Sequence, residues 1–320
     1  MIYSLIFLLL FILELAYFQL ADRYNIIDKP NQRSLHTQTT IRGGGIIFPI
    51  AIIIYFFYSD LEYPYFIAGL LIISIISFLD DIYTIPNRYR VIIQFLSIFL
   101  LLYEITIFNQ IGFWIFLLMI VLVGIINAYN FMDGINGITG GYSLINLLSL
   151  LLVNTYFTKF IENDFIIFIM LGVVVFNFFN FRKRAKCFAG DIGSISIAFI
   201  IIFLLIKLIL QTNQYIYILF LTLYGIDTVF TLIVRIWLKE NIFKAHNKHF
   251  FQLLVNKFGF SHLQVSLLYL FVQLIINLFV IFVIASMGNV LFNSIALLAI
   301  FSYIYIYLRI RAIKNKITIK

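Results

Sequence analysis

Residues 190–210 read GDIGSISIAFIIIFLLIKLIL, and this stretch decides the fold class. After the polar start Gly190-Asp191-Ile192-Gly193-Ser194, residues 195–210 contain a single charged side chain, that of Lys207. Such an apolar run is typical of a helix that crosses a membrane, whose hydrocarbon core is about 30 Å thick. The acidic, glycine-containing start is therefore expected where this helix meets water.

The same pattern recurs along the whole chain of 320 residues. Hydrophobic residues make up 63% and charged residues only 11%, and the mean hydropathy is +1.06. A soluble domain is about half apolar and about a quarter charged, so we expect an all-α polytopic membrane protein, a single helical domain over residues 1–320. About eleven spans are predicted, at roughly 2–20, 45–59, 64–79, 91–108, 113–128, 141–158, 165–181, 195–210, 215–233, 264–286 and 290–308.

The basic residues predict the orientation. With these spans, 20 of the 22 Lys and Arg residues fall in loops on one side or in the C-terminal tail, and only Lys159 and Lys207 do not. By the positive-inside rule that side is cytoplasmic, so the N-terminus is outside and the C-terminus is cytoplasmic. The net charge of +8 is then topological, and no nucleic-acid partner is needed to explain it. The second span is short, because residues 46–58 make only about 20 Å of helix.

Five polar segments carry most of the chemically distinctive side chains, and the predicted topology puts all five on the cytoplasmic face. They are residues 28–34 with 42–45, residues 80–81, 127–134, 190–194 and 246–249. Carboxylates, amides, histidines and arginines are the groups that a metal ion, a diphosphate and a lipid phosphate need. This convergence suggests an enzyme, and Asn31, Arg33 and Arg42 in the first segment are predicted to bind substrate.

Asp80 and Asp81 end the third predicted span. Two adjacent carboxylates at a membrane surface can bind a divalent cation or accept a proton. On a helix they point about 100° apart, so both need not face one ligand. The alternative is that they only mark the helix end, although acidic residues are unfavourable at a helix C-terminus.

Asn130, Asp133 and Asn136 follow one another at intervals of three, so they can line one face of a helical turn. This loop holds no Lys or Arg, and a metal ion would supply the missing positive charge. The alternative is a simple turn rich in Gly, Asn and Asp. Asp191 can be an N-terminal cap, but its flanking glycines and the four basic residues before it favour a phosphate or metal site.

His246 and His249 are three residues apart and can share a helix face. Two histidines alone do not make a zinc site, so hydrogen bonding or proton transfer to a phosphate or sugar is favoured. His262 stands apart from the motifs and is interpreted as an interfacial residue. His36 is left undecided.

Taken in order, these motifs resemble the polyprenyl-phosphate N-acetylhexosamine-1-phosphate transferases. The resemblance runs from about residue 22 to residue 252. It implies that a lipid phosphate attacks the β-phosphorus of a UDP-sugar with the help of Mg²⁺, with Mn²⁺ as an alternative. The products are a lipid-diphosphate-sugar and UMP.

The resemblance also implies residue roles. Asp80 and Asp81 match the aspartate pair implicated in activating the lipid phosphate. Asn130 and Asp191 match positions that look like Mg²⁺ ligands, and Asp133 matches a further acidic position that is essential in bacterial members.

On the donor side, Phe188 matches an aromatic that stacks on uracil, and Arg90 stands where relatives usually carry a diphosphate-binding lysine. His246 and His249 match a histidine-rich loop that helps to shape the sugar pocket. Asn136 stands where bacterial members usually have aspartate, which weakens a direct acid role there.

The form of the last motif, AHNKHFFQ at residues 245–252, looks most like the O-antigen-initiating group. That group implies undecaprenyl phosphate as acceptor and a UDP-HexNAc donor, either GlcNAc or a 6-deoxy-HexNAc such as FucNAc or QuiNAc. The expected location is a bacterial inner (plasma) membrane, and the oligomeric state, including a homodimer, is left open.

Three other classes are disfavoured. A transporter or flippase should have ionisable groups near the bilayer midplane, whereas the acidic motifs here are in loops. A CDP-alcohol phosphotransferase requires Asp-Gly-x-x-Ala-Arg, and after Asp133-Gly134 the corresponding positions are Gly137 and Ile138. A purely structural subunit gives no reason for five polar loops to share a side.

Overall fold

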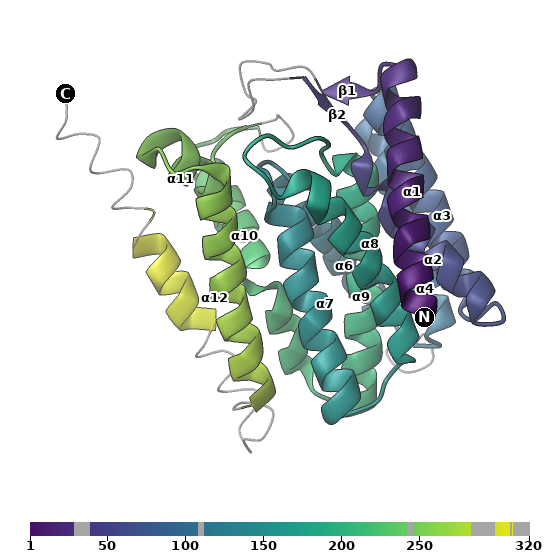
Figure 1. Cartoon of the computed structure of the whole chain (residues 1–320). Coiled ribbons are helices and arrows are strands. Elements are labelled where there is room, and N and C mark those ends of the chain that lie inside the picture. The colour runs from purple at the N-terminus through teal and green to yellow at the C-terminus, as the bar shows by residue number, and fades with distance from the viewer. Residues whose placement is uncertain (29–38, 108–111, 242–245, 283–297, 308, 310–320) are drawn as a thin grey trace.

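The computed structural model describes residues 1–28, 39–107, 112–241, 246–282, 298–307 and 309. They form a bundle of helices whose ends meet at two opposite faces (Figure 1). The first eight α-helices are α1 (Ile2–Arg23), α2 (Ile47–Tyr58), α3 (Pro64–Ile82), α4 (Asn87–Glu104), α6 (Trp114–Met132), α7 (Ile138–Tyr156), α8 (Asn163–Asn180) and α9 (Gly190–Thr212). The remaining elements are α10 (Thr222–Trp237), α11 (Phe250–Phe258), α12 (His262–Phe282), a short apolar helix at Leu298–Tyr307, the 3-10 helices η1 (Gly44–Ile46) and η2 (Tyr215–Leu221), and the paired strands β1 (Ile27–Asp28) and β2 (Thr40–Ile41).

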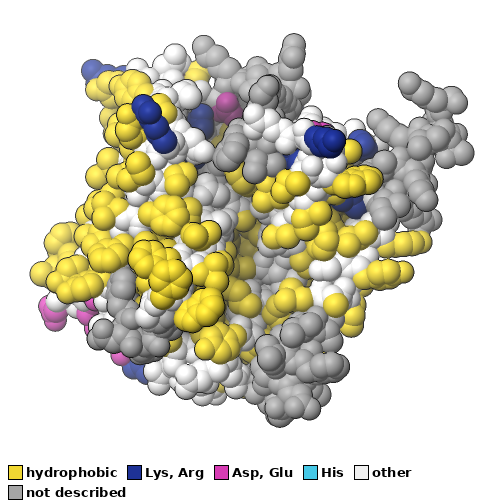
Figure 2. Space-filling model, turned by 180° about the vertical axis from the view of Figure 1, so that it is seen from behind, with side chains coloured by type: hydrophobic (Ala, Val, Ile, Leu, Met, Phe, Trp, Pro, Cys, Tyr) yellow, Lys and Arg dark blue, Asp and Glu magenta, His cyan; other side chains and the backbone are white. Residues whose placement is uncertain are grey.

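The described part of the chain contains eight helices that are long and apolar enough to cross a membrane. This confirms an all-α polytopic membrane protein, while the total of eleven spans and the orientation stay predictions. Apolar side chains cover the middle of the face shown in Figure 2, and most of its dark blue basic side chains lie near the upper end. That distribution is the one expected of a surface that meets lipid in the middle and water at its ends.

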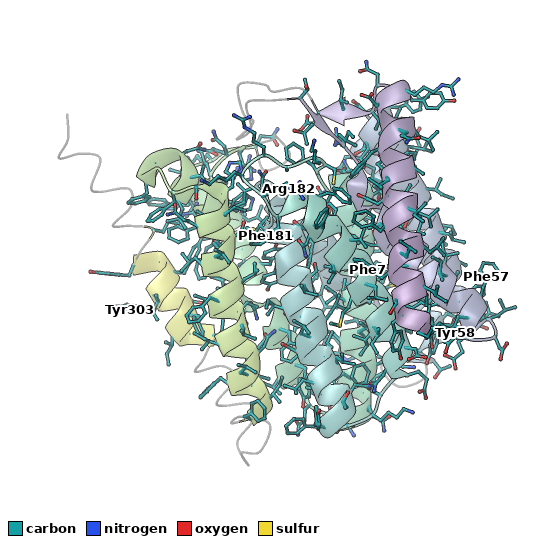
Figure 3. The ribbon with its side chains drawn as sticks, in the orientation of Figure 1. Phe7, Phe57, Tyr58, Phe181, Arg182 and Tyr303 are labelled. Atoms are coloured by element: carbon teal, nitrogen blue, oxygen red, sulfur yellow. The ribbon has the colours of Figure 1, made fainter. Side chains whose placement is uncertain are left out.

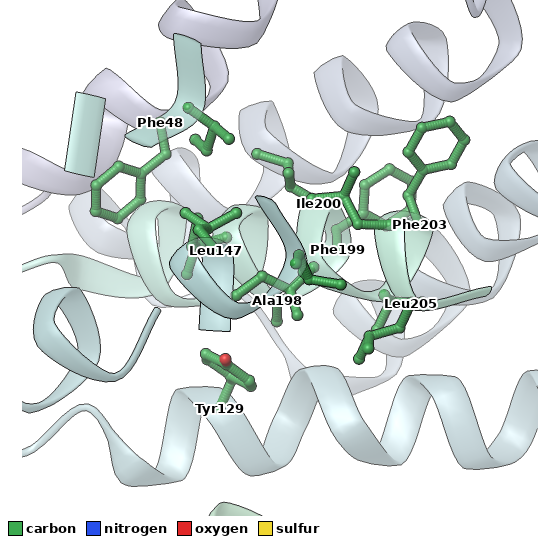
Figure 4. Packing of buried hydrophobic residues seen from close by; sticks show 14 of the residues in the cluster. Phe48, Tyr129, Leu147, Ala198, Phe199, Ile200, Phe203 and Leu205 are labelled. Carbon is green, nitrogen blue, oxygen red and sulfur yellow. The ribbon is translucent and has the colours of Figure 1, made fainter. Parts of the chain in front are cut away.

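The stretch that decides the fold class becomes the central helix of the bundle. Nearly every side chain from Ile195 to Leu208 in α9 is buried, and the helix packs against α2, α3, α6 and α7. Figure 4 shows Phe199 and Phe203 of α9 among the packed side chains. Phe66 of α3 stacks on both rings, at 5.5 and 4.1 Å between centroids. A continuous apolar run can be a central helix because it meets protein on all sides.

The short second helix is continuous with the glycines before it. η1 leads directly into α2, and together they form one apolar helical segment, Gly44–Tyr58. Phe48, Ala51 and Ile52 of α2 are fully buried against neighbouring helices. Since this helix is largely surrounded by protein, its length need not match the thickness of the hydrocarbon core.

The two faces differ in their loops. Phe181 and Arg182, which follow α8, lie near the upper face in Figure 3, whereas Phe57 and Tyr58, at the end of α2, lie at the opposite one. The strands β1 and β2 and the helix α11 also lie at the upper face in Figure 1. The predicted polar segments that the structure describes therefore belong to the same end of the bundle.

Candidate active site

Acidic and basic side chains from four segments meet at this end of the bundle. Arg90 of α4 bridges two carboxylates, with Nη1 2.6 Å from Asp80 Oδ2 and Nη2 2.8 Å from Asp191 Oδ2. Arg42 makes a second bridge, with Nε 2.7 Å from Asp81 Oδ1 and Nη2 3.6 Å from Asp191 Oδ1. If all five groups are charged, the cluster keeps one negative charge in excess. Such a cluster can accept a cation and can present guanidinium groups to phosphates.

The start of α9 is capped by a residue from another helix. Asp81, at the end of α3, accepts the backbone N–H of Asp191 at 2.8 Å and that of Ile192 at 3.0 Å. The first N–H groups of a helix have no partner within the helix and favour a negative charge. Asp81 is only 8% exposed, so these bonds satisfy a carboxylate that water hardly reaches. The same cap places Asp191 beside the arginines.

A short backbone ladder brings Arg42 and Phe188 to the same place. The N–H of Phe188 donates to the carbonyl of Ile41 at 2.8 Å, and the N–H of Gly44 donates back to the carbonyl of Phe188 at 2.8 Å. One step further, the N–H of Gly45 donates to Ala189 at 3.1 Å. Residues 41–45 are therefore held by backbone hydrogen bonds to residues 188 and 189, which lead into α9.

A cavity of about 290 Å³ opens beside this cluster. Its lining residues are Asp28, Arg42, Asn130, Asp133, Gly134, Ile135, Asn136, Asn180, Phe188, Gly190, Asp191, Gln252 and His262. Asp80, Asp81 and Arg90 do not line it, and they connect to it through Arg42 and Asp191. The cavity thus has a charged end near Asp191 and a wall of amide and imidazole groups.

Asn130, in the last turn of α6, and Asp133, just after it, both line this cavity. Asn130 Nδ2 donates to Asp191 Oδ1 and to Ser194 Oγ, both at 3.0 Å. Asp133 is the residue that follows α6, and burial raises the pKa of its carboxyl to about 7. This acid therefore changes its charge near neutral pH, where a bound cation would favour the ionised form.

Asn136 cannot be replaced by aspartate without losing its contacts. Its Nδ2 donates to the carbonyl oxygens of Arg182 at 2.9 Å and Lys183 at 3.2 Å. A carboxylate has no hydrogen to donate and would repel both oxygens. Asparagine at this position therefore fits the local backbone, whatever its contact with substrate.

His262, interpreted from the sequence as an interfacial residue, lines the cavity. Its Nδ1 accepts the N–H of Asn136 at 3.4 Å, and Ser266, one turn along α12, donates its hydroxyl to the carbonyl of Asn136 at 2.8 Å. Asp28, in the first polar segment, and Gln252, the last residue of the motif at 245–252, also line the cavity, although the sequence assigned neither of them a role in the site.

The two loop histidines lie behind the cavity and do not line it. His249 is 3% exposed, and its Nδ1 lies 3.3 Å from Asp227 Oδ1. His246 stacks on His249 with 4.9 Å between ring centroids, and burial lowers the pKa of His246 to about 4. His246 is therefore neutral at physiological pH. The predicted substrate residues Asn31 and Arg33 lie outside the described residues.

Among the residues that the structure describes, no three His, Cys, Asp or Glu side chains form a group that could hold a metal ion. Asn130 and Asp191 nevertheless adjoin on the cavity wall, and both side chains carry oxygen atoms that can bind a metal ion, although Asn130 faces Asp191 with its amide nitrogen. Two such ligands suit a cation that takes its other ligands from water and substrate phosphates. The site therefore fits a metal bound together with a substrate better than a preformed protein cage.

Residues 63–209 match the model of glycosyl transferase family 4. The matched region contains the acidic cluster, Arg90, Asn130 and Phe188, and it ends before the histidine loop. This match supports the polyprenyl-phosphate sugar-1-phosphate transferase family, and with it a sugar-phosphate transferase activity. No curated protein matches the chain.

Proposed function

We propose that this protein transfers a HexNAc-1-phosphate from a UDP-sugar to undecaprenyl phosphate and releases UMP. The donor sugar would be GlcNAc or a 6-deoxy-HexNAc such as FucNAc or QuiNAc. The reaction would be the first membrane step of O-antigen or another cell-surface polysaccharide, at a bacterial inner membrane. The observation that carries the proposal is the meeting of Asp80, Asp81 and Asp191 with two arginines at one end of a membrane bundle, beside a cavity.

The reaction is a phosphoryl transfer. An oxygen of the lipid phosphate forms a bond to the β-phosphorus of the donor, and the bond from that phosphorus to the bridging oxygen breaks, so that UMP leaves with this oxygen. Such chemistry asks a protein mainly to place anions and to neutralise charge. Arg42 and Arg90 can do so by exchanging part of their carboxylate contacts for phosphate oxygens, since a guanidinium group matches both in geometry.

Asn130 and Asp191 would hold Mg²⁺, or Mn²⁺, together with the donor diphosphate. The bound ion would supply charge neutralisation at the phosphates. Side chains of the protein would supply the remaining roles. Asp80 and Asp81 keep the arginines in place, and Asp133 offers a carboxyl that titrates near neutral pH.

A membrane-anchored acceptor explains why such a site sits at the end of an apolar bundle. The lipid tail can stay in hydrocarbon while its phosphate reaches the charged end of the cavity. A transporter is disfavoured because the acidic cluster lies at the helix ends and not midway along the spans.

The direct test is to incubate the purified protein with a panel of UDP-HexNAc donors, undecaprenyl phosphate and Mg²⁺, and to measure UMP and the lipid product. We expect UMP only when both substrates are present. UMP without a lipid product would indicate hydrolysis, and the absence of UMP with every donor would refute the proposal.

Replacing Phe188 tests the predicted uracil contact. We expect Phe188→Ala to weaken binding of UMP by about 5- to 150-fold, because stacking of a base on an aromatic ring contributes about 1–3 kcal/mol. Phe188→Tyr keeps the ring and should bind UMP nearly as well as the original protein. Titration calorimetry with UMP measures both, and equal affinity in Phe188→Ala would rule out stacking.

Asp80 and Asp81 should differ in what they stabilise. We expect both Asp80→Asn and Asp81→Asn to lower turnover by orders of magnitude, since each breaks a bridge to an arginine. Asp81→Asn should also cost about 1–3 kcal/mol of stability, because an amide hydrogen would then face one of the two N–H groups at the start of α9. Asp80 accepts a single backbone N–H, that of Ile85, which the remaining oxygen of Asp80→Asn can still accept, so this variant should lose less stability. Turnover and thermal unfolding of both variants decide this, and equal stability would contradict the capping role.

A further inference from the structure

Asp227 of α10 is a buried carboxylate that the reaction described above does not use. It is 1% exposed, and no motif in the sequence marks it. Its oxygens contact six groups: Nδ1 of His249 at 3.3 Å, the N–H of Phe250 at 2.9 Å, the N–H of Phe251 at 3.4 Å, and the hydroxyls of Tyr269 at 2.7 Å, Tyr305 at 3.0 Å and Thr231 at 3.3 Å. A buried carboxylate needs such partners, because each lost hydrogen bond leaves an uncompensated charge.

Two of these bonds hold the start of α11. The N–H groups of Phe250 and Phe251 belong to its first turn, and Asp227 accepts both from outside the helix. Within α11, Gln252 Oε1 accepts the N–H of His249 at 3.1 Å, which fixes the direction of the glutamine side chain. Gln252 also lines the cavity. Asp227 is therefore connected to the cavity wall through one turn of helix.

The same turn packs on the loop that carries Asp133. The ring of Phe251 is fully buried, and it lies so close to Gly134 that a Cβ on this glycine would stand 2.9 Å from Cζ of the ring. Any shift of α11 would therefore be felt at Gly134, which also lines the cavity. The buried ring of Phe251 therefore links α11, which carries Gln252, to Gly134 on the cavity wall.

A second contact holds the segment that precedes α11. Arg309 Nη2 donates to the carbonyl of Lys248 at 2.9 Å, and Nη1 donates at 2.9 Å to the hydroxyls of Thr231 and Tyr305. Lys248 also pairs with Glu240, which in turn lies 3.4 Å from Arg235. Asp227 thus stands at the centre of a polar network that fastens the histidine loop to α10 and α12.

We propose that Asp227 is the positioning residue for the sugar end of the donor site. It holds α11 so that Gln252 and, through the buried ring of Phe251, Gly134 stay fixed in the part of the cavity wall that would face the sugar. This assignment rests on the proposed function. Loss of the carboxylate should loosen that wall and weaken binding of the donor. Binding of the lipid acceptor should be unaffected, because its phosphate meets the charged end of the cavity.

The experiment compares three variants of the full-length protein in detergent or nanodiscs. Asp227→Asn removes one oxygen that caps α11, whereas Tyr269→Phe and Tyr305→Phe each remove one donor to the same carboxylate and leave the bonds to α11 in place. Steady-state kinetics with UDP-GlcNAc, or with the UDP-HexNAc that the original protein turns over fastest, gives the KM of the donor and that of undecaprenyl phosphate. Thermal unfolding gives the stability of each variant.

We expect Asp227→Asn to raise the donor KM about tenfold or more, with the acceptor KM within about twofold of the original. The two tyrosine variants should lose stability and keep the donor KM. If Asp227→Asn loses stability with an unchanged donor KM, or if all three variants change KM alike, the role is only structural and the proposal is overturned.

Two further measurements keep the test decisive. If Asp227→Asn does not fold, Gln252→Ala should raise the donor KM while losing only the bond that the Gln252 side chain makes to the N–H of His249, and an unchanged KM would overturn the proposal. Hydrogen exchange at the amides of Phe250 and Phe251 should be faster in Asp227→Asn. If the original protein is inactive with every donor, the proposed function and the donor role of Asp227 are refuted together. Hydrogen exchange at Phe250 and Phe251 would still report whether Asp227 anchors α11.

Discussion

Asp191→Asn is expected to lower transfer by more than about 10²-fold and to leave the protein folded. The change keeps the shape of the side chain and removes its charge, so both arginine bridges to this carboxylate are lost. Removing one well-placed electrostatic contact from a catalytic site costs about 10²- to 10³-fold in rate. Asp191 would lose more than that if it also holds the metal ion.

Asp22→Asn is the matched control, because Asp22 is exposed at the end of α1 and carries the same charge change outside the cluster. Turnover should be unchanged in this variant. Measuring turnover over a range of Mg²⁺ concentrations separates two roles for Asp191, since partial recovery at high Mg²⁺ would indicate a weakened metal ligand. Near-normal turnover of Asp191→Asn at ordinary Mg²⁺ would remove this residue from the site.

Gly190→Ala is expected to abolish transfer and to lower stability by about 1–3 kcal/mol. Gly190 has φ of 71°, a left-handed conformation that costs a residue with a Cβ about 1–2 kcal/mol. An added Cβ would also lie 2.5 Å from Asp81 Oδ2 and 2.8 Å from the backbone nitrogen of Gly43. One methyl group would therefore displace Asp81, which caps α9, and Gly43, which lies next to Arg42 in the segment bonded to residues 188 and 189.

Gly124→Ala provides the control for this substitution. Gly124 lies within α6, and nothing stands within 4 Å of the Cβ that the change adds. This variant should be as active and as stable as the original protein, because alanine also favours the helix. Turnover and thermal unfolding measure both variants, and an active Gly190→Ala would show that the contact between Asp81 and α9 is not required.

Much of the fold could be predicted because the helices are long and apolar. Residues 195–210 form the interior of α9, and the third, sixth and seventh predicted spans fall within or close to α3, α7 and α8. Hydropathy alone does not say whether an apolar helix faces lipid or protein. The short second span shows this, since α2 is buried by its neighbours and hydropathy gives no sign of it.

The structure brings the charged side chains of the candidate site together at one end of the bundle. Asp80, Asp81, Arg42, Arg90 and Asp191 stand together because each lies at a helix end or in a loop on the same face. Charged residues in an apolar chain are few, so their positions stand out in the sequence.

The uncharged part of the site could not be predicted in the same way. His262 and Gln252 reach the cavity because α11 and α12 pack against the end of α6, and no spacing along the chain encodes that packing. The histidine loop carried the visible motif, yet the ring of His249 contacts the buried Asp227 and the ring of His246 stacks on that of His249. Partners this distant in sequence leave no local pattern to detect.

The cap that Asp81 places on α9 also limits how this site can be reused. Its two halves come from helices 110 positions apart, and neither half is complete alone, since α9 needs the acid and the acid needs the amides of α9. A protein engineer who grafts the acidic loop residues onto another scaffold would transfer the charges without their support. The unit to transplant is the contact between the end of α3 and the start of α9, including Gly190, the first residue of α9.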